Sequence, residues 1–490
     1  MKLMHKLLLL ITTLISTATF ADWSVQEDNW YSVTIDGVKS GWSHKLIEVD
    51  SETNNIKSRE IQNMTLSRGG MEITIKVTST FLETASGDPI SAHSTQEAMG
   101  MVQESTWVFG TEQLEMTTAA GGEPIVKKVP LPKEPWLTPQ AVKRMFKKKM
   151  GEGAKAITYQ TMASELGPSV ITVMMTKSGE STLDVLGNKM NVIGWETVND
   201  KISVKGTEFY TDSGLHVGSK MNAGFGAIEN KIMSKYDAMS PINEVPELMV
   251  SLFVEPNKPI ANDLSTLTML VKTKNDTKVK LPSVGMQHAT SHEDGTATLV
   301  VDLESPIAAT KAELTDKKYL DASAICDGTD EAVIAIATGV LASLSEDSDD
   351  SAKALALRSA IHEFIEDKNM STAFASASQV ARSKEGDCSE HAVLLCGVLR
   401  AADIPSRGVM GMVYAPTFGG PNGAFGWHMW SQALIDGRWV DLDATLKTPY
   451  SVGHIATLTS SLSDEDFAAE MAGIIETIGN LEVEIIDEEK

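Results

Sequence analysis

The sequence predicts an α+β protein in which β-rich N-terminal domains precede a C-terminal domain that combines helices with a strand hairpin. Three observations lead to this prediction. Apolar and polar residues alternate in strand-like runs from Asp22 to about Tyr236. After about Thr310 the composition changes to helix-forming residues. Two further strand-like runs return at 426–445, around an Asp-Gly pair that is typical of a hairpin turn.

The composition is that of a globular protein. Of the 490 residues, 42% are hydrophobic and 22% are charged, which is enough to build real cores. The net charge of −24 repels polyphosphate and argues against nucleic acid as a partner. Three cysteines are too few for a disulfide-rich scaffold or a four-cysteine metal site. The acidic stretch Glu346–Asp350 lacks the glycine and terminal Glu of a calcium loop, so we expect no metal or cofactor.

Residues 1–21 have the pattern of a signal peptide. Two lysines precede the apolar run Leu7–Ile15, and the small residues Thr19 and Ala21 fit a cleavage site. The run is shorter than the roughly 20 apolar residues that a bilayer span needs, and no cysteine follows it as a lipid anchor. We therefore expect an exported protein, periplasmic or secreted, without stable membrane insertion.

The segment 22–240 is predicted as a β-rich N-terminal domain that binds a partner or positions a substrate. Trp30–Trp42 contains two alternating runs around Asp36-Gly37, the pattern of a hairpin. Similar runs follow at Met71–Phe81, Val170–Met175 and Lys201–Thr211. One helix is expected at about Pro139–Met150. Its basic residues could bind an anionic surface, or they could form an ordinary solvated helix face.

A linker at Met239–Pro246 leads to a small β module at 247–310. Short strands are expected there, separated by turns at Asn275-Asp276 and Asp294-Gly295.

Periodic helices at Asp330–Leu344 and Ala352–Ile365 begin the next domain, which we place at 320–460. The remaining residues, 461–490, are rich in carboxylates and are predicted as an acidic C-terminal extension.

The residue type and position of Cys388 suggest a nucleophile. Asp387, followed three residues later by Glu390, forms a capping-box pattern, so a helix begins at about Cys388. Free backbone N–H groups and the helix dipole at that end stabilise a thiolate. The same N–H groups can donate to the oxyanion that forms during acyl transfer.

The other two cysteines have different positions. Cys396 lies eight residues further along the predicted helix, roughly 12 Å from Cys388, which is too far for a disulfide. Cys396 is therefore either a buried thiol on the helix face or the partner of Cys326 in a disulfide. Both alternatives leave Cys388 free.

The hairpin at 426–445 supplies a candidate base and acid. If Asp436-Gly437 forms a two-residue loop, His428 and Asp443 become diagonal neighbours on one face. Asp441 shares that face but lies one side-chain position further along the strand from His428. The geometry therefore favours Asp443 as the partner of His428. A three-residue loop would place His428 and Asp443 on opposite faces.

A cysteine at a helix start, together with a histidine and an aspartate on paired strands, is typical of a thiol nucleophile with an oriented base. His391 is a rival base, because it lies on the helix of Cys388, but it has no obvious acid partner. Trp427, next to His428, could line an acyl pocket or simply pack in the core.

These motifs resemble those of the transglutaminase-like superfamily, and in particular its exported bacterial members of the cysteine peptidase type. The resemblance rests on GDCSEHAVLLCGVLRAADIPSR, on His-Met-Trp and on RWVDLDAT, and it covers about 320–460. It implies a papain-like fold in which the cysteine helix packs on an antiparallel sheet. It also implies that Cys388 is the nucleophile, His428 the base and Asp443 the acid.

The resemblance implies a cysteine acyl-transfer enzyme acting on a protein or peptide, with hydrolysis of peptide or carboxamide bonds as the first choice. A protein-crosslinking transglutaminase and a non-catalytic periplasmic binding or scaffold protein are the alternatives. The sequence departs from the family at Met429 and Ala444, where the family more often has Ala or Pro, and in its second oxyanion donor. Many members use an upstream Trp as second oxyanion donor, and none occurs between Trp195 and Trp427. Gln379 is a weak substitute, and the donor stays unassigned.

Overall fold

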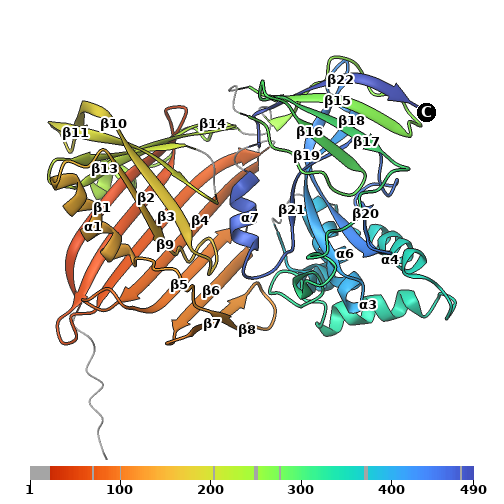
Figure 1. Cartoon of the computed structure of the whole chain (residues 1–490), viewed down its shortest axis with the longest axis horizontal. Helices are drawn as coiled ribbons and strands as arrows, with labels where there is room; N and C mark the ends of the chain where they lie inside the picture. The colour runs from red at the N-terminus through yellow and green to blue at the C-terminus, as the bar shows by residue number, and fades with distance from the viewer. Residues whose placement is uncertain are drawn as a thin grey trace, which may run out of the picture.

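The computed structural model describes residues 23–68, 71–99, 101–201, 205–247, 252–274, 278–368, 374–474 and 477–490. The predicted signal peptide and the predicted turn at Asn275-Asp276 lie outside these residues. Within them the strands form three antiparallel sheets of fourteen, four and four strands (Figure 1). None of the helices in these ranges combines the length and apolar character that a membrane span requires.

The largest sheet consists of two meanders that meet at their first and last strands. Strands β1 to β8 follow one another along the sheet, strands β9 to β14 do the same, and β1 pairs with β14. The predicted two-residue turn at Asp36-Gly37 is confirmed, because Ile35 pairs with Val38 and both turn residues have positive φ. The strands are β1 (Trp23–Ile35), β2 (Val38–Asp50), β3 (Ile56–Arg68), β4 (Met71–Glu83), β5 (Pro89–Ala98), β6 (Met101–Phe109), β7 (Gln113–Ala119), β8 (Ile125–Pro130), β9 (Ala156–Thr161), β10 (Ile171–Val185), β11 (Asn188–Asn199), β12 (Gly206–Thr211), β13 (His216–Ala223) and β14 (Gly226–Met233).

This sheet curls, so that its second meander returns across the first (Figure 1). The hydroxyl of Tyr31 on β1 donates to the carbonyl of His216 on β13, which shows that the two meanders are in contact. The predicted helix at 139–150 is confirmed as α1 (Pro139–Gly151), and its Phe146 is buried against Trp195. A short helix, α2 (Lys235–Ala238), follows β14.

The second sheet combines the predicted small β module with the end of the chain. Its order is β16 (Gln287–Ser291), β17 (Ala297–Asp302), β15 (Thr266–Thr273) and β22 (Leu481–Glu489). Strand β22 belongs to the segment predicted as an acidic extension. It buries Leu481, Val483 and Ile485, while the glutamates between them face outward, and this alternation is a strand pattern.

The third sheet carries the C-terminal helices. Its order is β20 (Arg438–Leu442), β19 (Gly423–Ile435), β18 (Ser406–Gly420) and β21 (His454–Ser460). Helix α6 (Cys388–Ala401) packs on β19 and β18 and is buried along almost its whole length. The surrounding helices are α3 (Glu331–Leu341), α4 (Asp350–Phe364), α5 (Ala377–Ser383) and α7 (Phe467–Gly473). The predicted fold class, β-rich N-terminal regions followed by a cysteine helix on an antiparallel sheet, is confirmed.

Candidate active site

Cys388 is the first residue of α6, as the capping pattern predicts. The Asp387 side chain accepts a hydrogen bond from the Ser389 N–H, and the Glu390 carboxylate accepts from the Asp387 N–H at 3.0 Å. Glu390 also accepts from the Ala375 N–H at 2.9 Å, which ties the helix start to the preceding loop. Burial, and then the nearby Asp387 charge, raise the pKa of Glu390 to about 7. Cys388 itself is half-buried, so its thiol lies at the open end of an otherwise buried helix.

The β19–β20 hairpin has the predicted register. Ile435 pairs with Arg438, and the pairing continues to Ser431 and Leu442, so the loop consists of Asp436 and Gly437. Strand β20 ends at Leu442, and the next residue is Asp443. The two-residue loop therefore places His428 and Asp443 on the same side of the hairpin.

His428 Nε2 lies 2.7 Å from Asp443 Oδ2, and both side chains are buried. Asp441 has different partners, since its carboxylate accepts from Trp430 Nε1 at 2.8 Å and Gln432 Nε2 at 2.7 Å. The geometric preference for Asp443 over Asp441 is confirmed. Because Nε2 faces Asp443, the second ring nitrogen of His428, Nδ1, remains for an exchange of protons with a thiol.

The charges of the site favour a protonated His428. Burial by itself would lower the pKa of this imidazole, but the charge of Asp443 and its hydrogen bond outweigh that effect. The interaction with the Cys388 side chain acts in the same direction, and the pKa of His428 rises to about 10. Burial opposes ionisation of Asp443 as well, yet the His428 charge and hydrogen bonds hold its pKa well below the usual range. The arrangement suits an imidazolium that is held by a carboxylate.

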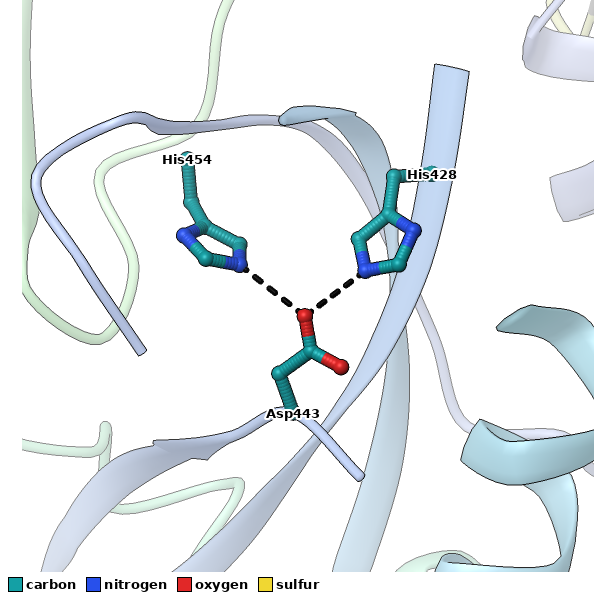
Figure 2. A group of neighbouring side chains, drawn as sticks. All are labelled: His428, Asp443 and His454. Carbon is teal, nitrogen blue, oxygen red and sulfur yellow. Dashed lines mark hydrogen bonds and ion pairs between the residues drawn. The ribbon is translucent and has the colours of Figure 1, made fainter. Parts of the chain in front are cut away.

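A second histidine, His454, contacts the same carboxylate (Figure 2). His454 Nε2 lies 3.2 Å from Asp443 Oδ2, while Asp443 Oδ1 accepts from the backbone N–H groups of Thr445 and Leu446. The sequence analysis missed His454, which is the first residue of β21. Its contact depends on the order of strands in the sheet, and no local pattern in the sequence signals that order.

His428, Asp443 and His454 also form the kind of group that could ligate a metal ion, because their ligand atoms lie within 4.8 Å of one another. The carboxylate oxygen, however, sits between the two ring nitrogens at hydrogen-bond distances of 2.7 and 3.2 Å. An ion placed there would have to replace both hydrogen bonds. The geometry fits a carboxylate that is held by two imidazoles.

The rival base, His391, is held by its own helix. Its Nδ1 donates to the Asp387 carbonyl at 2.6 Å, and its buried Nε2 has no hydrogen-bond partner among the described residues. Burial lowers the pKa of His391 to about 4, so the ring is neutral at physiological pH. It has no carboxylate hydrogen bond comparable to that of His428.

Two other candidates from the sequence are engaged elsewhere. The amide oxygen of Gln379 accepts from Ser376 in the capping box of α5, and its amide nitrogen lies against Gly121 in the loop between β7 and β8. Trp427 packs against the core of the second sheet, and as the strand neighbour of His428 it faces the opposite side. The second oxyanion donor therefore remains unassigned.

Cys326 and Cys396 are free thiols, which settles the alternative left open by the sequence. Both are fully buried in the core of the C-terminal domain. Burial raises the pKa of Cys326 to about 12 and also raises the pKa of Cys396. Of the three cysteines, Cys388 alone combines access to solvent with a histidine partner.

Residues 336–444 match the family model of the transglutaminase-like superfamily, so the chain contains a domain of this superfamily. The matched segment includes Cys388, His428 and Asp443. The comparison with curated proteins gives no match.

Solved structures offer distant likenesses. A β-barrel-like protein of a domain of unknown function from Brucella abortus is 9% identical, with 42% of this chain and 94% of that chain covered and a TM-score of 0.34. A candidate cysteine protease from Cytophaga hutchinsonii is 18% identical, with 45% and 81% covered and a TM-score of 0.28. A candidate protease from Parabacteroides distasonis is 12% identical, with 74% and 68% covered and a TM-score of 0.20.

Proposed function

We propose that this protein is an exported cysteine acyl-transfer enzyme that hydrolyses peptide or carboxamide bonds. The observation that carries the proposal is the buried 2.7 Å contact between His428 and Asp443, together with the position of Cys388 as the first residue of α6. The superfamily match of residues 336–444 supports a cysteine-protease-like activity. The signal-peptide pattern of residues 1–21 supports export to the periplasm or the medium.

Each residue of the triad has one task in this proposal. The Cys388 thiolate forms a bond to the carbonyl carbon, and the N–H groups at the start of α6 stabilise the oxyanion. When the C–N bond breaks, His428 gives its proton to the leaving amine. A water molecule then gives a proton to His428 and attacks the thioester, which releases the acid and restores the thiolate. Asp443 holds the imidazole in the required orientation.

The reactivity of Cys388 tests the activated thiol. We expect iodoacetamide to label Cys388 at pH 6 about tenfold or more faster than free cysteine, because little free cysteine is thiolate at that pH. Mass spectrometry would map the labelled site, with the buried thiols of Cys326 and Cys396 as internal controls. The proposal fails if Cys388 reacts no faster than free cysteine and His428→Ala leaves its rate unchanged.

Two aspartate variants separate the orienting acid from its neighbour. We expect Asp443→Asn to reduce turnover by about 10³- to 10⁴-fold, the size of effect seen when an orienting acid is neutralised in a serine triad. Asp441→Asn is the matched control, since Asp441 is also buried but contacts Trp430 and Gln432. An equal loss in both variants would contradict the assignment of Asp443.

A peptide mixture distinguishes hydrolysis from amine transfer. The protein would be incubated with peptides that contain internal Gln residues, with and without an added primary amine, and the products identified by mass spectrometry. We expect cleaved or deamidated peptides whose yield does not depend on the amine, and no products from Cys388→Ala. Amine-modified peptides as the main product would instead support a transglutaminase.

A further inference from the structure

His454 belongs to β21, which pairs with β18 on the side away from β19. Across β18, His428 is opposite Gly411 and His454 is opposite Val413. These two residues of β18 are two positions apart, so both histidines project from the same face of the sheet. The centroids of their rings are 6.0 Å apart, and Asp443 Oδ2 lies between their Nε2 atoms (Figure 2). The order of the strands therefore gives Asp443 a second imidazole.

The ring of His454 is held in one orientation. It is fully buried, it stacks on Tyr450 with 4.4 Å between the ring centroids, and it meets Trp430 edge-on at 5.1 Å. Its Nδ1 lies 3.0 Å from the Ser451 carbonyl oxygen, 3.2 Å from the Ser451 hydroxyl and 3.3 Å from the Ser451 nitrogen. Because packing and Ser451 fix the other side of the ring, Nε2 faces Asp443.

The proton of the contact between His454 and Asp443 lies on the histidine. Burial opposes ionisation of Asp443, but the charge and hydrogen bonds of its histidine neighbours hold its pKa well below the usual range. An ionised carboxylate can only accept hydrogen bonds, so His454 Nε2 carries a proton. A neutral ring of this tautomer accepts at Nδ1 from the Ser451 N–H or hydroxyl, and a protonated ring donates there to the Ser451 carbonyl. Both forms present the same Nε2–H to Asp443.

Donors then surround the Asp443 carboxylate. Oδ2 accepts from His428 and His454, while Oδ1 accepts from the backbone N–H groups of Thr445 and Leu446. An ionised carboxylate has about four lone-pair sites, so these four donors occupy the whole group and oppose its rotation. Without His454, the oxygen that faces His428 would be held by His428 alone.

We propose that His454 is a positioning residue, whose Nε2–H donates to Asp443 and holds the carboxylate where it orients His428. The inference rests on the proposed function, because it assumes that Cys388, His428 and Asp443 act as a triad. His454 itself touches no reacting atom. Both Nε2 atoms carry protons in this arrangement, so neither offers a lone pair to a metal ion.

Turnover of a glutamine-containing peptide tests this task. We expect His454→Phe to lower kcat by about 10- to 100-fold, less than the loss expected for Asp443→Asn, and to change KM by no more than about twofold. The side-chain amide of His454→Gln can still donate a hydrogen bond, so this variant should recover most of the lost rate.

Thr457→Val is the matched control. It removes a buried hydrogen bond of the same strand, from Thr457 Oγ1 to the Met410 carbonyl at 3.1 Å, and should keep the wild-type kcat. Circular dichroism checks that each variant is folded. The same kcat in His454→Phe as in Thr457→Val would overturn the proposal, and so would a kcat in His454→Gln as low as that in His454→Phe.

Nitrogen-15 NMR of histidine-labelled protein tests the hydrogen bond without a substrate. We expect His454 Nε2 of the wild-type protein to carry a proton at neutral pH. In His454→Phe, the His428 Nε2 proton should exchange with water about tenfold or more faster, because one hydrogen bond to a charged group is lost. An unprotonated His454 Nε2, or unchanged exchange in a folded variant, would contradict the proposal.

The two experiments also separate this inference from the proposed function. If the wild-type protein turned over no peptide while both NMR results held, the proposed function would fail and the hydrogen bond from His454 to Asp443 would stand. Wild-type turnover without the NMR results would support the triad and remove His454 from it.

Discussion

At the scale of single residues, two aspartates two positions apart have different environments. Asp443 accepts hydrogen bonds from His428, from His454 and from two backbone N–H groups, which together favour its ionised form. Burial dominates at Asp441 and raises its pKa, although Trp430 and Gln432 donate to it. A carboxylate that is kept ionised can hold a protonated imidazole, so the environment of Asp443 suits this task better than that of Asp441.

The His428–Asp443 pair predicts how stability depends on pH. The pKa of His428 is about 10 in the folded protein and about 6.5 in an unfolded chain, so its contribution is complete below pH ~6.5. That contribution is lost as the pH rises toward 10, because the unfolded chain releases the proton first. We expect the free energy of unfolding, measured in urea between pH 6 and 10, to fall more steeply in wild type than in His428→Gln. Parallel curves would contradict the raised pKa.

At the scale of elements, helix α4 holds the chain that carries Asp443 after β20 has ended. Arg358 Nε donates to the Asp443 carbonyl at 2.6 Å, and the same guanidinium donates to the Leu446 carbonyl. One turn later, His362 Nδ1 donates to the Ala444 carbonyl at 2.9 Å. The sheet no longer constrains this segment, so its position depends on these bonds from the helix.

Arg358→Met tests the role of α4. The variant leaves the buried Asp443 carbonyl and the half-buried Leu446 carbonyl without their charged donor, so we expect a loss of about 2–4 kcal/mol in the free energy of unfolding, measured in urea. Arg382→Met is the control, because the Arg382 side chain is 56% exposed where it pairs with Asp330, and such pairs contribute about 0–1 kcal/mol. A loss in Arg358→Met no larger than in Arg382→Met would show that the segment of Asp443 does not depend on these bonds.

At the scale of the whole molecule, the three sheets are joined by specific polar contacts. The Gln287 side chain of the second sheet accepts from the Ala456 N–H and donates to the Ala456 carbonyl of the third. Lys127 of the large sheet forms ion pairs with Asp464 and Glu465, which follow the third sheet. The third sheet and the segment that follows it therefore contact both of the other sheets.

Gly285→Ala tests the contact between the second and third sheets. Gly285 has φ +56°, and a Cβ there would overlap Asp441 Oδ2, so we expect a loss of about 2 kcal/mol or more in the free energy of unfolding. Gly437→Ala is the control, with φ +73° and open space around its Cβ, and should cost about 1–2 kcal/mol from backbone strain alone. Thermal and urea unfolding would measure both. A smaller loss at Gly285 than at Gly437 would contradict the close contact.

Features that depend on neighbouring residues could be predicted from the sequence. The capping residues Asp387 and Glu390 fix the start of α6, and the Asp436-Gly437 turn fixes the register that brings His428 to Asp443. The pattern of β22 was also present, since Leu481 to Ile485 alternates between apolar and acidic residues. The many acidic residues of that segment led to the prediction of an extension instead of a strand, although acidic side chains fit the solvent face of a strand.

The sequence by itself determined the helix start, the hairpin and the three side chains that they present, because turns and caps form from hydrogen bonds over a few residues. Only the tertiary structure decided that His454 shares the Asp443 carboxylate, that Arg358 holds the segment beside it, and that the end of the chain completes the second sheet. It also decided that the large sheet curls around a cavity. These contacts join segments far apart in the chain, and packing of the whole molecule selects them.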